Sequence, residues 1–292
     1  MAGSLARGPI AATAQSIWSC RIFYQDEYGD VLESIHDNGT WSRNDSPLFY
    51  GKPSTPLAVV SWDEGREVRV YCVNKEDYLE EWCSSDEQGW FQGSLTGLRV
   101  RVAPDTSIAA INWEGSNIRV YVQEADSSDI QEYYCSGEWN RGVTLPAGHQ
   151  GTSIAAAKWL DDAGVHIRVY YQTPDLLLQE HGWDGDEWYQ SGFSPGEIPP
   201  NSPITAVAWL GDEPQIRVYY NDAHGSLAGH EWVGEWRWIG EVWSVPPGSH
   251  LTAIEWGNGR AIRVYYQDDS STVLEACHDG GSWSNGAVVA SN

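Results

Sequence analysis

The stretch Ile167-Arg168-Val169-Tyr170-Tyr171-Gln172 recurs six times along the chain with small changes. Its copies read CRIFYQD, VRVYCVN, IRVYVQE, IRVYYQT, IRVYYND and IRVYYQD. Their arginines stand 46 to 50 residues apart and are Arg21, Arg69, Arg119, Arg168, Arg217 and Arg263. Self-similarity at a period of about 20–50 residues indicates a repeat architecture. Because six copies occupy nearly all of the 292 residues, we expect a single domain over residues 1–292.

Each copy contains four strand-like pieces separated by Gly, Asp, Asn, Ser and Pro. The second piece is the IRVYYQ run, whose alternation suits a pleated strand. The third piece is short and usually ends in Glu, and the fourth surrounds a Trp. Four short strands per repeat are typical of a propeller blade. We therefore predict an all-β fold, a six-bladed β-propeller with four-stranded antiparallel blades.

The first piece is a run of small and β-branched residues that usually ends in Trp. The tryptophans are Trp62, Trp113, Trp159, Trp209 and Trp256, whereas Gln15 stands at this position in the first copy. We expect these tryptophans to be structural and to pack between neighbouring blades.

The composition argues against several kinds of partner. The formal net charge is −24, from 41 Asp and Glu against 17 Lys and Arg. Such an acidic surface repels nucleic acid and anionic lipid. No stretch approaches the roughly 20 apolar residues of a membrane span. We expect a soluble protein that has no nucleic-acid partner and does not insert into membranes.

The cysteines and the start of the chain carry further expectations. The five cysteines include no CxxC pair, so we expect neither a disulfide framework nor a metal site, and no cofactor. Residues 1–15 have no long apolar run and do not resemble a signal peptide. We therefore expect a cytoplasmic protein or one exported by an unconventional route to the cell or spore surface.

A glutamate follows the repeat arginine at a nearly constant distance. The glutamates are Glu33, Glu81, Glu180 and Glu275 at twelve residues and Glu132 at thirteen, while Gly229 replaces the glutamate in the fifth copy. A hairpin of this length could place Arg and Glu side by side on adjacent strands. One interpretation is a repeated structural salt bridge, which is worth little if exposed. The other is a ligand site, because the planar guanidinium holds two neighbouring oxygens and the carboxylate accepts from hydroxyls.

Aromatic residues complete this pattern. A Trp stands seven to nine residues after the Glu position in every copy: Trp41, Trp90, Trp139, Trp188, Trp236 and Trp283. Three residues after the Glu position stand His36, Ser84, Cys135, Trp183, Trp232 and His278. The chain has 17 Trp and 15 Tyr but only 4 Phe. Trp and Tyr join a flat apolar face to a polar group, which suits the C–H face and hydroxyl rim of a sugar ring.

The combination of IRVYYQ, the spaced Glu and the following Trp resembles the fungal fucose-specific lectin family, of the Aleuria aurantia lectin type. The resemblance covers all six repeats. It implies a six-bladed propeller that is a homodimer, with fucose sites between consecutive blades. It also implies that Arg and Glu come from one blade and the aromatic residues from the next.

Carried onto this sequence, the resemblance implies five complete fucose pockets. They are Arg21 and Glu33 with Ser84 and Trp90, Arg69 and Glu81 with Cys135 and Trp139, Arg119 and Glu132 with Trp183 and Trp188, Arg168 and Glu180 with Trp232 and Trp236, and Arg263 and Glu275 with His36 and Trp41. The fifth pocket in chain order is degenerate, with Arg217, Gly229, His278 and Trp283. A shifted strand could present His230 or Glu231 there.

These observations predict a multivalent lectin that recognises L-fucose on fucosylated glycans, acts in cell adhesion and has no catalytic activity. Two alternatives stay open. A sialidase-type propeller enzyme would need unlike residues at one place, and only the partial match SIHDNGTW at 34–41 resembles its Asp box. A protein-interaction propeller of the WD40 kind would need Gly-His and Trp-Asp to recur in register, and HGWDGDEW at 181–188 is a single chance match.

Overall fold

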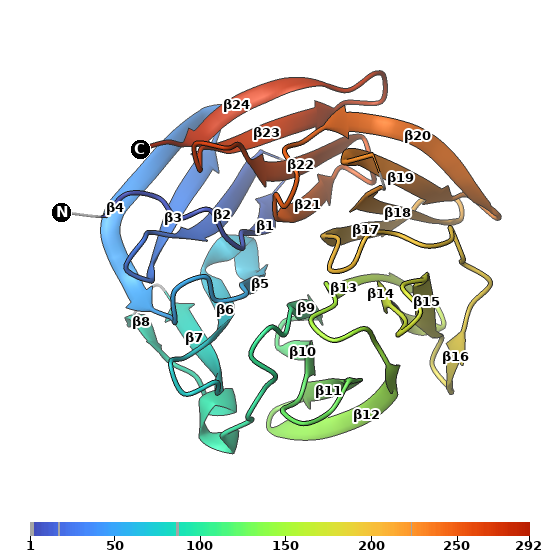
Figure 1. Ribbon diagram of the computed structural model, residues 1–292, viewed down its shortest axis with the longest axis horizontal. Helices are drawn as coiled ribbons and strands as arrows, with labels where there is room; N and C mark the ends of the chain where they lie inside the picture. The colour runs from blue at the N-terminus through green and yellow to red at the C-terminus, as the bar shows by residue number, and fades with distance from the viewer. Residues whose placement is uncertain (1–2, 17, 86–87, 223) are drawn as a thin grey trace.

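The structure is a computed structural model and describes residues 3–16, 18–85, 88–222 and 224–292. Each sequence repeat forms one sheet of four antiparallel strands in chain order, and the six sheets stand around a central axis (Figure 1). The prediction of an all-β, six-bladed propeller is confirmed. Within the described ranges, no helix has the length and apolar character needed to cross a membrane.

The strands follow the repeats closely. Blades 1 and 2 contain β1 (Ala11–Ser16), β2 (Ser19–Gln25), β3 (Asp30–Asp37), β4 (Thr40–Tyr50), β5 (Ala58–Trp62), β6 (Glu67–Val73), β7 (Leu79–Ser85) and β8 (Gly89–Gln92). Blades 3 and 4 contain β9 (Ile108–Trp113), β10 (Asn117–Gln123), β11 (Asp129–Cys135), β12 (Trp139–Ala147), β13 (Ala155–Asp161), β14 (Gly164–Gln172), β15 (Leu178–Trp183) and β16 (Trp188–Gln190). Blades 5 and 6 contain β17 (Ile204–Leu210), β18 (Pro214–Asn221), β19 (Ser226–Trp232), β20 (Trp236–Ser244), β21 (Leu251–Trp256), β22 (Ala261–Gln267), β23 (Val273–His278) and β24 (Ser284–Ala290). Two short 3₁₀ helices, η1 (Asp63–Gly65) and η2 (Ser94–Leu98), lie in blade 2.

The second strand of each blade is buried on both faces, which explains why the IRVYYQ run is almost continuously apolar. In β6, Val68 and Val70 belong to a buried cluster shared with blade 1, whereas Tyr71 and Val73 belong to one shared with blade 3. Successive side chains of a strand point to opposite faces. Six such clusters occur, one at each boundary between neighbouring blades.

The ring closes without exchange of a strand between its ends. The C-terminal strand β24 pairs with β23 inside blade 6, and β1 packs against both β5 and β21. The backbone N–H of Gly8 donates to the side chain of Gln267 at 2.8 Å, and the Ser34 hydroxyl donates to the carbonyl of Val289 at 3.1 Å. Side-chain contacts therefore join the first and last blades, and the C-terminus lies beside the boundary of blades 1 and 6 (Figure 1).

Candidate functional site

The repeat arginines point toward the following blade. In β6, Arg69 shares its face with Tyr71 and Val73, which pack against blade 3. The same alternation holds in β2, where Arg21 shares its face with Phe23, and Phe23 packs against blade 2. Each arginine therefore lies at the boundary with the next blade in the chain.

The tryptophans at the ends of the first strands stack against these arginines. The guanidinium carbon lies 4.6 to 5.2 Å from the ring centre in five pairs: Arg69 on Trp62, Arg119 on Trp113, Arg168 on Trp159, Arg217 on Trp209 and Arg263 on Trp256. All five tryptophans also pack in the clusters between blades, as predicted. A cation over an aromatic face is attracted by the ring quadrupole. These residues therefore orient the arginines as well as filling the core, a role that the sequence analysis missed.

The glutamates lie diagonally from the arginines, so the expectation of side-by-side placement is wrong in detail. Glu81 faces Tyr71 across the sheet, and Arg69 faces Cys83. Because Arg and Tyr stand two residues apart, all three side chains still share one face. The Arg–Glu nitrogen–oxygen distances are 3.7 Å for Arg21–Glu33, 3.4 Å for Arg119–Glu132, 3.6 Å for Arg168–Glu180 and 3.6 Å for Arg263–Glu275. In the second repeat, Arg69 pairs with Glu67 instead, at 2.9 Å.

A tyrosine hydroxyl holds each glutamate except the first. The hydroxyls of Tyr71, Tyr121 and Tyr265 donate to Glu81, Glu132 and Glu275 at 3.2, 3.0 and 3.0 Å, and Tyr170 donates to Glu180 in the same way. In the first repeat Phe23 stands at this position and supplies no hydroxyl. The first tyrosine of IRVYYQ is therefore a functional position, and its recurrence in five of six copies is the signal that could have identified it.

The tryptophan of the fourth piece meets the same face from the next blade. Edge-to-face contacts with ring centres 5.6 to 6.5 Å apart occur at all six boundaries: Phe23–Trp90, Tyr71–Trp139, Tyr121–Trp188, Tyr170–Trp236, Tyr219–Trp283 and Tyr265–Trp41. The last pair joins blade 6 to blade 1. The structure thus brings each predicted Arg to the same boundary as the Trp predicted to accompany it.

The residues three positions after the glutamate contact these tryptophans or face them across the sheet. Ring centres lie 5.1 to 6.0 Å apart in His36–Trp41, Trp183–Trp188, Trp232–Trp236 and His278–Trp283. Ser84 faces Trp90 across the sheet, and Cys135 faces Trp139. We number the resulting pockets one to six, each after the blade that supplies its arginine.

The second pocket is an open cavity of about 330 Å³. Its lining includes Arg69, Glu81, Cys135 and Trp139, which are the four residues predicted for it. The lining also includes Cys83, Gly93 and Trp62. Residues of blades 2 and 3 therefore enclose one space, which is large enough for a monosaccharide ring.

The fifth pocket departs from the others as its sequence predicts. Gly229 faces Tyr219, the register that the glutamates have in the other blades. The strand is therefore not shifted. Glu231 nevertheless pairs with Arg217 at 2.8 Å, because it lies directly opposite that residue in the sheet. His230 points to the other side and contacts Tyr220. The fifth arginine thus has a carboxylate partner, but in a different place from the other pockets.

Burial tunes the ionisation of the glutamates. It raises the pKa of Glu33, Glu81, Glu132 and Glu180 above the ordinary value, and the nearby arginines and hydrogen bonds oppose the shift. The pKa of Asp184 behaves differently. Burial raises it, but hydrogen bonds from Arg168, Tyr189 and His166 outweigh that effect and lower it to about 2.

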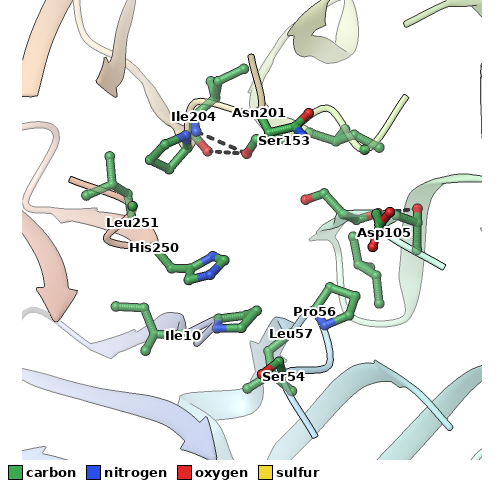
Figure 2. A pocket seen from close by; sticks show the side chains of 18 of the residues that line it. Ile10, Ser54, Pro56, Leu57, Asp105, Ser153, Asn201, Ile204, His250 and Leu251 are labelled. Carbon is green, nitrogen blue, oxygen red and sulfur yellow. Dashed lines mark hydrogen bonds between the residues drawn. The ribbon is translucent and has the colours of Figure 1, made fainter. Parts of the chain in front are cut away.

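A separate cavity of about 440 Å³ lies at one end of the central axis (Figure 2). Aliphatic residues from all six blades line it: Ile10, Leu57, Ile108, Ile154, Ile204 and Leu251. His250 points into the cavity (Figure 2). Its lining contains none of the recurring Arg, Glu or Trp residues. Across the part of the chain that the structure describes, no group of three or more His, Cys, Asp or Glu side chains could hold a metal ion.

Fold and site together define a multivalent binding propeller, in which one Arg–Glu–aromatic arrangement recurs at the boundaries between blades. The family model described as fungal fucose-specific lectin matches residues 4–261 and 173–292. The chain therefore belongs to the fungal fucose-specific lectin family. This membership confirms the prediction of a lectin without catalytic activity, in place of the sialidase-type and WD40-type alternatives.

Individual relatives agree with this placement. The fucose-specific lectin of Aleuria aurantia is 33% identical over 92% of this chain and 90% of its own length. The fucose-specific lectin of Aspergillus fumigatus is 30% identical over 85% of this chain and 84% of its own. A crystal structure of the Aleuria aurantia lectin, a six-bladed β-propeller, covers 100% of this chain and 98% of its own, with a TM-score of 0.87 and 30% identity.

Proposed function

We propose that this protein binds L-fucose residues of fucosylated glycans in the pockets between adjacent blades. The observation that carries this proposal is the meeting of Arg, Glu and Trp at these boundaries, with Arg and Glu from one blade and Trp from the next. A variant of the related Aleuria aurantia lectin was solved in complex with alpha-methyl-L-fucoside. The family resemblance and the chemistry of this site favour the same class of ligand.

Each group has a defined part in this proposal. The arginine donates to two neighbouring hydroxyl or ring oxygens, and the ionised glutamate accepts from a hydroxyl. The tryptophan covers the C–H face or the methyl group of the sugar. The Arg–Glu nitrogen–oxygen distances of 3.4 to 3.7 Å exceed ordinary hydrogen-bond lengths. Both groups therefore keep the capacity to bind a hydroxyl that bridges them.

The residues proposed for fucose are those of the first, second, third, fourth and sixth pockets. In that order they are Arg21, Glu33, Ser84 and Trp90; Arg69, Glu81, Cys135 and Trp139; Arg119, Glu132, Trp183 and Trp188; Arg168, Glu180, Trp232 and Trp236; and Arg263, Glu275, His36 and Trp41. In the fifth, with Arg217, His278 and Trp283, we propose weak binding or none, because Gly229 supplies no carboxylate.

We also propose that residues 1–292 act as one domain and that two chains associate as a homodimer. Single sites of this shallow kind bind modestly, and several on one ring raise avidity through effective concentration. Such a protein suits adhesion to fucosylated cell surfaces. Light scattering coupled to size-exclusion chromatography measures the mass in solution, and a monomer would contradict the dimer.

Titration calorimetry with methyl α-L-fucoside tests the proposed function. We expect five binding sites per chain, and one fewer in Arg168→Ala with the unfolding midpoint close to that of the parent. An unchanged number of sites in this variant would contradict the assignment of the fourth pocket. A glycan array would then identify the linkage that is preferred. Absence of heat with fucoside, together with robust hydrolysis of chromogenic fucosides, would overturn the lectin proposal.

A further inference from the structure

The arginines of the fourth and sixth pockets share a feature that the other four do not show among the described residues. Arg168 donates from Nη1 to one oxygen of Asp184 at 2.8 Å and from Nη2 to the other at 3.2 Å. Arg263 donates to Asp279 in the same way, at 2.7 and 3.3 Å. Both aspartates stand four residues after the pocket glutamate. In each case the carboxylate covers the end of the guanidinium that carries Nη1 and Nη2.

This contact leaves one edge of the guanidinium available. A guanidinium has five N–H donors in a fixed fork. Nη1 of Arg168 also donates to the carbonyl of Ile167 at 2.8 Å, and Nη1 of Arg263 to that of Ile262 at 3.0 Å. The aspartate and this carbonyl occupy three of the five donors. The N–H of Nε and one N–H of Nη2 remain, and Nε faces the pocket glutamate at 3.6 Å in both blades.

We propose that Asp184 and Asp279 are positioning residues, which hold this edge of the arginine against the glutamate and make the fourth and sixth pockets the tightest fucose sites of the ring. The inference rests on the proposed function. A side chain that is already ordered loses less conformational entropy when the ligand binds. Because fucose carries no charge, the neutralisation of the arginine by aspartate weakens the interaction little.

The remaining arginines show what happens without such a contact to an aspartate. Arg69 and Arg217 turn Nη2 toward another carboxylate, Glu67 at 2.9 Å and Glu231 at 2.8 Å. Arg21 presents Nη1 rather than Nε to its glutamate. Within the described part of the chain, none of these three arginines forms an ion pair through Nε with a pocket glutamate.

Arg119 is an intermediate case. It presents Nε to Glu132 at 3.4 Å, as in the fourth and sixth pockets. Stacking between Trp113 and Tyr134, each 4.8 Å from the guanidinium carbon, holds it there instead of a carboxylate. Stacking fixes the plane of the guanidinium, whereas the bidentate aspartate also fixes its rotation within that plane. We therefore place the third pocket after the fourth and sixth in affinity.

The aspartate of the fourth pocket is itself anchored. It accepts from Tyr189 and lies 2.6 Å from Nδ1 of His166, whose other ring nitrogen lies 3.0 Å from Asp161. This network keeps Asp184 ionised, in agreement with its pKa of about 2. Asp279 is more exposed, with 62% of its side-chain surface accessible against 38% for Asp184. Salt screens exposed pairs more strongly, so the sixth pocket is the more sensitive of the two to salt.

The first repeat provides a matched control. Asp37 stands at the same repeat position as Asp184 and Asp279, four residues after Glu33. Its hydrogen-bond partner is the side chain of the adjacent Asn38, at 3.0 Å, and not Arg21. Replacing Asp37 therefore removes a carboxylate at the equivalent position without removing a hydrogen-bond partner of the pocket arginine.

The experiment compares Asp184→Asn with Asp37→Asn in chains that keep a single pocket arginine, the other five being replaced by Ala. With Arg168 as the only arginine, we expect Asp184→Asn to weaken binding of methyl α-L-fucoside by roughly three- to tenfold. With Arg21 as the only arginine, Asp37→Asn leaves the affinity unchanged. The same Asp184→Asn chain should discriminate less against a sulfated methyl fucoside, because the charge of Arg168 is no longer compensated. A structural defect alone would not change the ratio of the affinities for the sulfated and the unsulfated methyl fucoside.

The outcomes separate the inference from the function on which it rests. If the parent with Arg168 binds fucoside and its Asp184→Asn variant binds with equal or higher affinity, this inference alone is overturned. If neither single-arginine parent binds fucoside, the proposed function is overturned together with the inference. If the variants with five arginines replaced do not fold, crystals of the full chain are soaked at increasing fucoside concentrations. The occupancy of each pocket is then measured. The fourth and sixth pockets should then fill first, and in Asp184→Asn the fourth should fall behind the sixth. Unchanged order would overturn the inference.

Discussion

The indole N–H of Trp139, in blade 3, donates to Oε2 of Glu81, in blade 2, at 3.2 Å. The same oxygen accepts from the backbone N–H of Leu95 at 3.1 Å, and the other oxygen accepts from Tyr71 at 3.2 Å. The pocket glutamate is thus part of the interface that joins two blades. A sugar hydroxyl in the second pocket has to compete with these bonds, so we expect this pocket to bind more weakly than the third or fourth.

Trp139→Phe should lower the free energy of unfolding. It preserves an aromatic ring against Tyr71 but removes the N–H that Glu81 accepts from. A hydrogen bond to a charged group contributes about 1.5–3 kcal/mol, and we expect a loss of that order in denaturant unfolding. Trp188→Phe is the control, because Trp188 makes the same contact with Tyr121 but its N–H has no hydrogen bond among the described residues. Equal losses in the two variants would mean that the bond to Glu81 adds nothing.

The raised pKa values of the glutamates predict that fucose binding weakens as the pH falls. A protonated carboxyl no longer offers two acceptor oxygens to the sugar. Burial raises the pKa of Glu33, Glu81, Glu132 and Glu180, so the loss should begin above the ordinary pKa of glutamate. Titration calorimetry from neutral pH downward measures it. A constant affinity down to the ordinary glutamate pKa would contradict the proposed role of these carboxylates.

The contribution of these glutamates to the free energy of unfolding should change with pH in the opposite direction. A carboxyl whose pKa is higher in the folded than in the unfolded chain binds its proton more tightly when folded. Its contribution to stability is therefore greatest at low pH and is lost as the pH rises through the folded pKa. Glu132→Gln removes this dependence, so the stability of the variant relative to the parent should increase with pH. A decrease over the same range would show that ionisation of Glu132 stabilises the fold.

Much of the site could be predicted from the sequence, because the repeat brings like residues to like places. Once the pitch near 49 residues indicates a ring, the family resemblance predicts which blade supplies which residue. The orientation of each arginine could not be predicted in this way. It depends on residues that do not recur, such as Glu67 beside Arg69 and Glu231 opposite Arg217. These contacts are set by single positions and leave no periodic signal.

Gly142→Ala should remove binding at the third pocket without unfolding the ring. A Cβ at this position would lie 2.1 Å from Oε2 of Glu132. Glu132 is buried and can turn away only by giving up bonds from the Tyr121 hydroxyl and the Val143 N–H. We therefore expect a misplaced carboxylate together with a stability loss of about 1.5–3 kcal/mol. Calorimetry should then find one site fewer per chain. Gly192→Ala is the control, since nothing lies within 4 Å of its added Cβ, and it should retain all sites.

Gly93 and Gly286 adjoin Glu81 and Glu275 as closely as Gly142 adjoins Glu132, with oxygens 2.1 and 2.3 Å from an added Cβ. The three glycines therefore share one function, which is to leave room for the pocket carboxylate. Retention of every fucose site in Gly142→Ala would contradict this interpretation.

The fifth pocket should gain a fucose site only when two residues change together. A Cβ at Gly229 would lie 2.9 Å from Cδ1 of Ile239, so that isoleucine occupies the space that a glutamate carboxylate would need. Tyr219, which is buried and faces Gly229, would supply the hydroxyl that holds the glutamate in other blades. We therefore expect Gly229→Glu alone to lower stability without adding a site. Gly229→Glu with Ile239→Ala should bind one more fucoside per chain than Ile239→Ala alone, measured by calorimetry. A gain in the single variant would show that Ile239 is no obstacle. No gain in the double variant would mean that the pairing of Arg217 with Glu231 by itself keeps this pocket inactive.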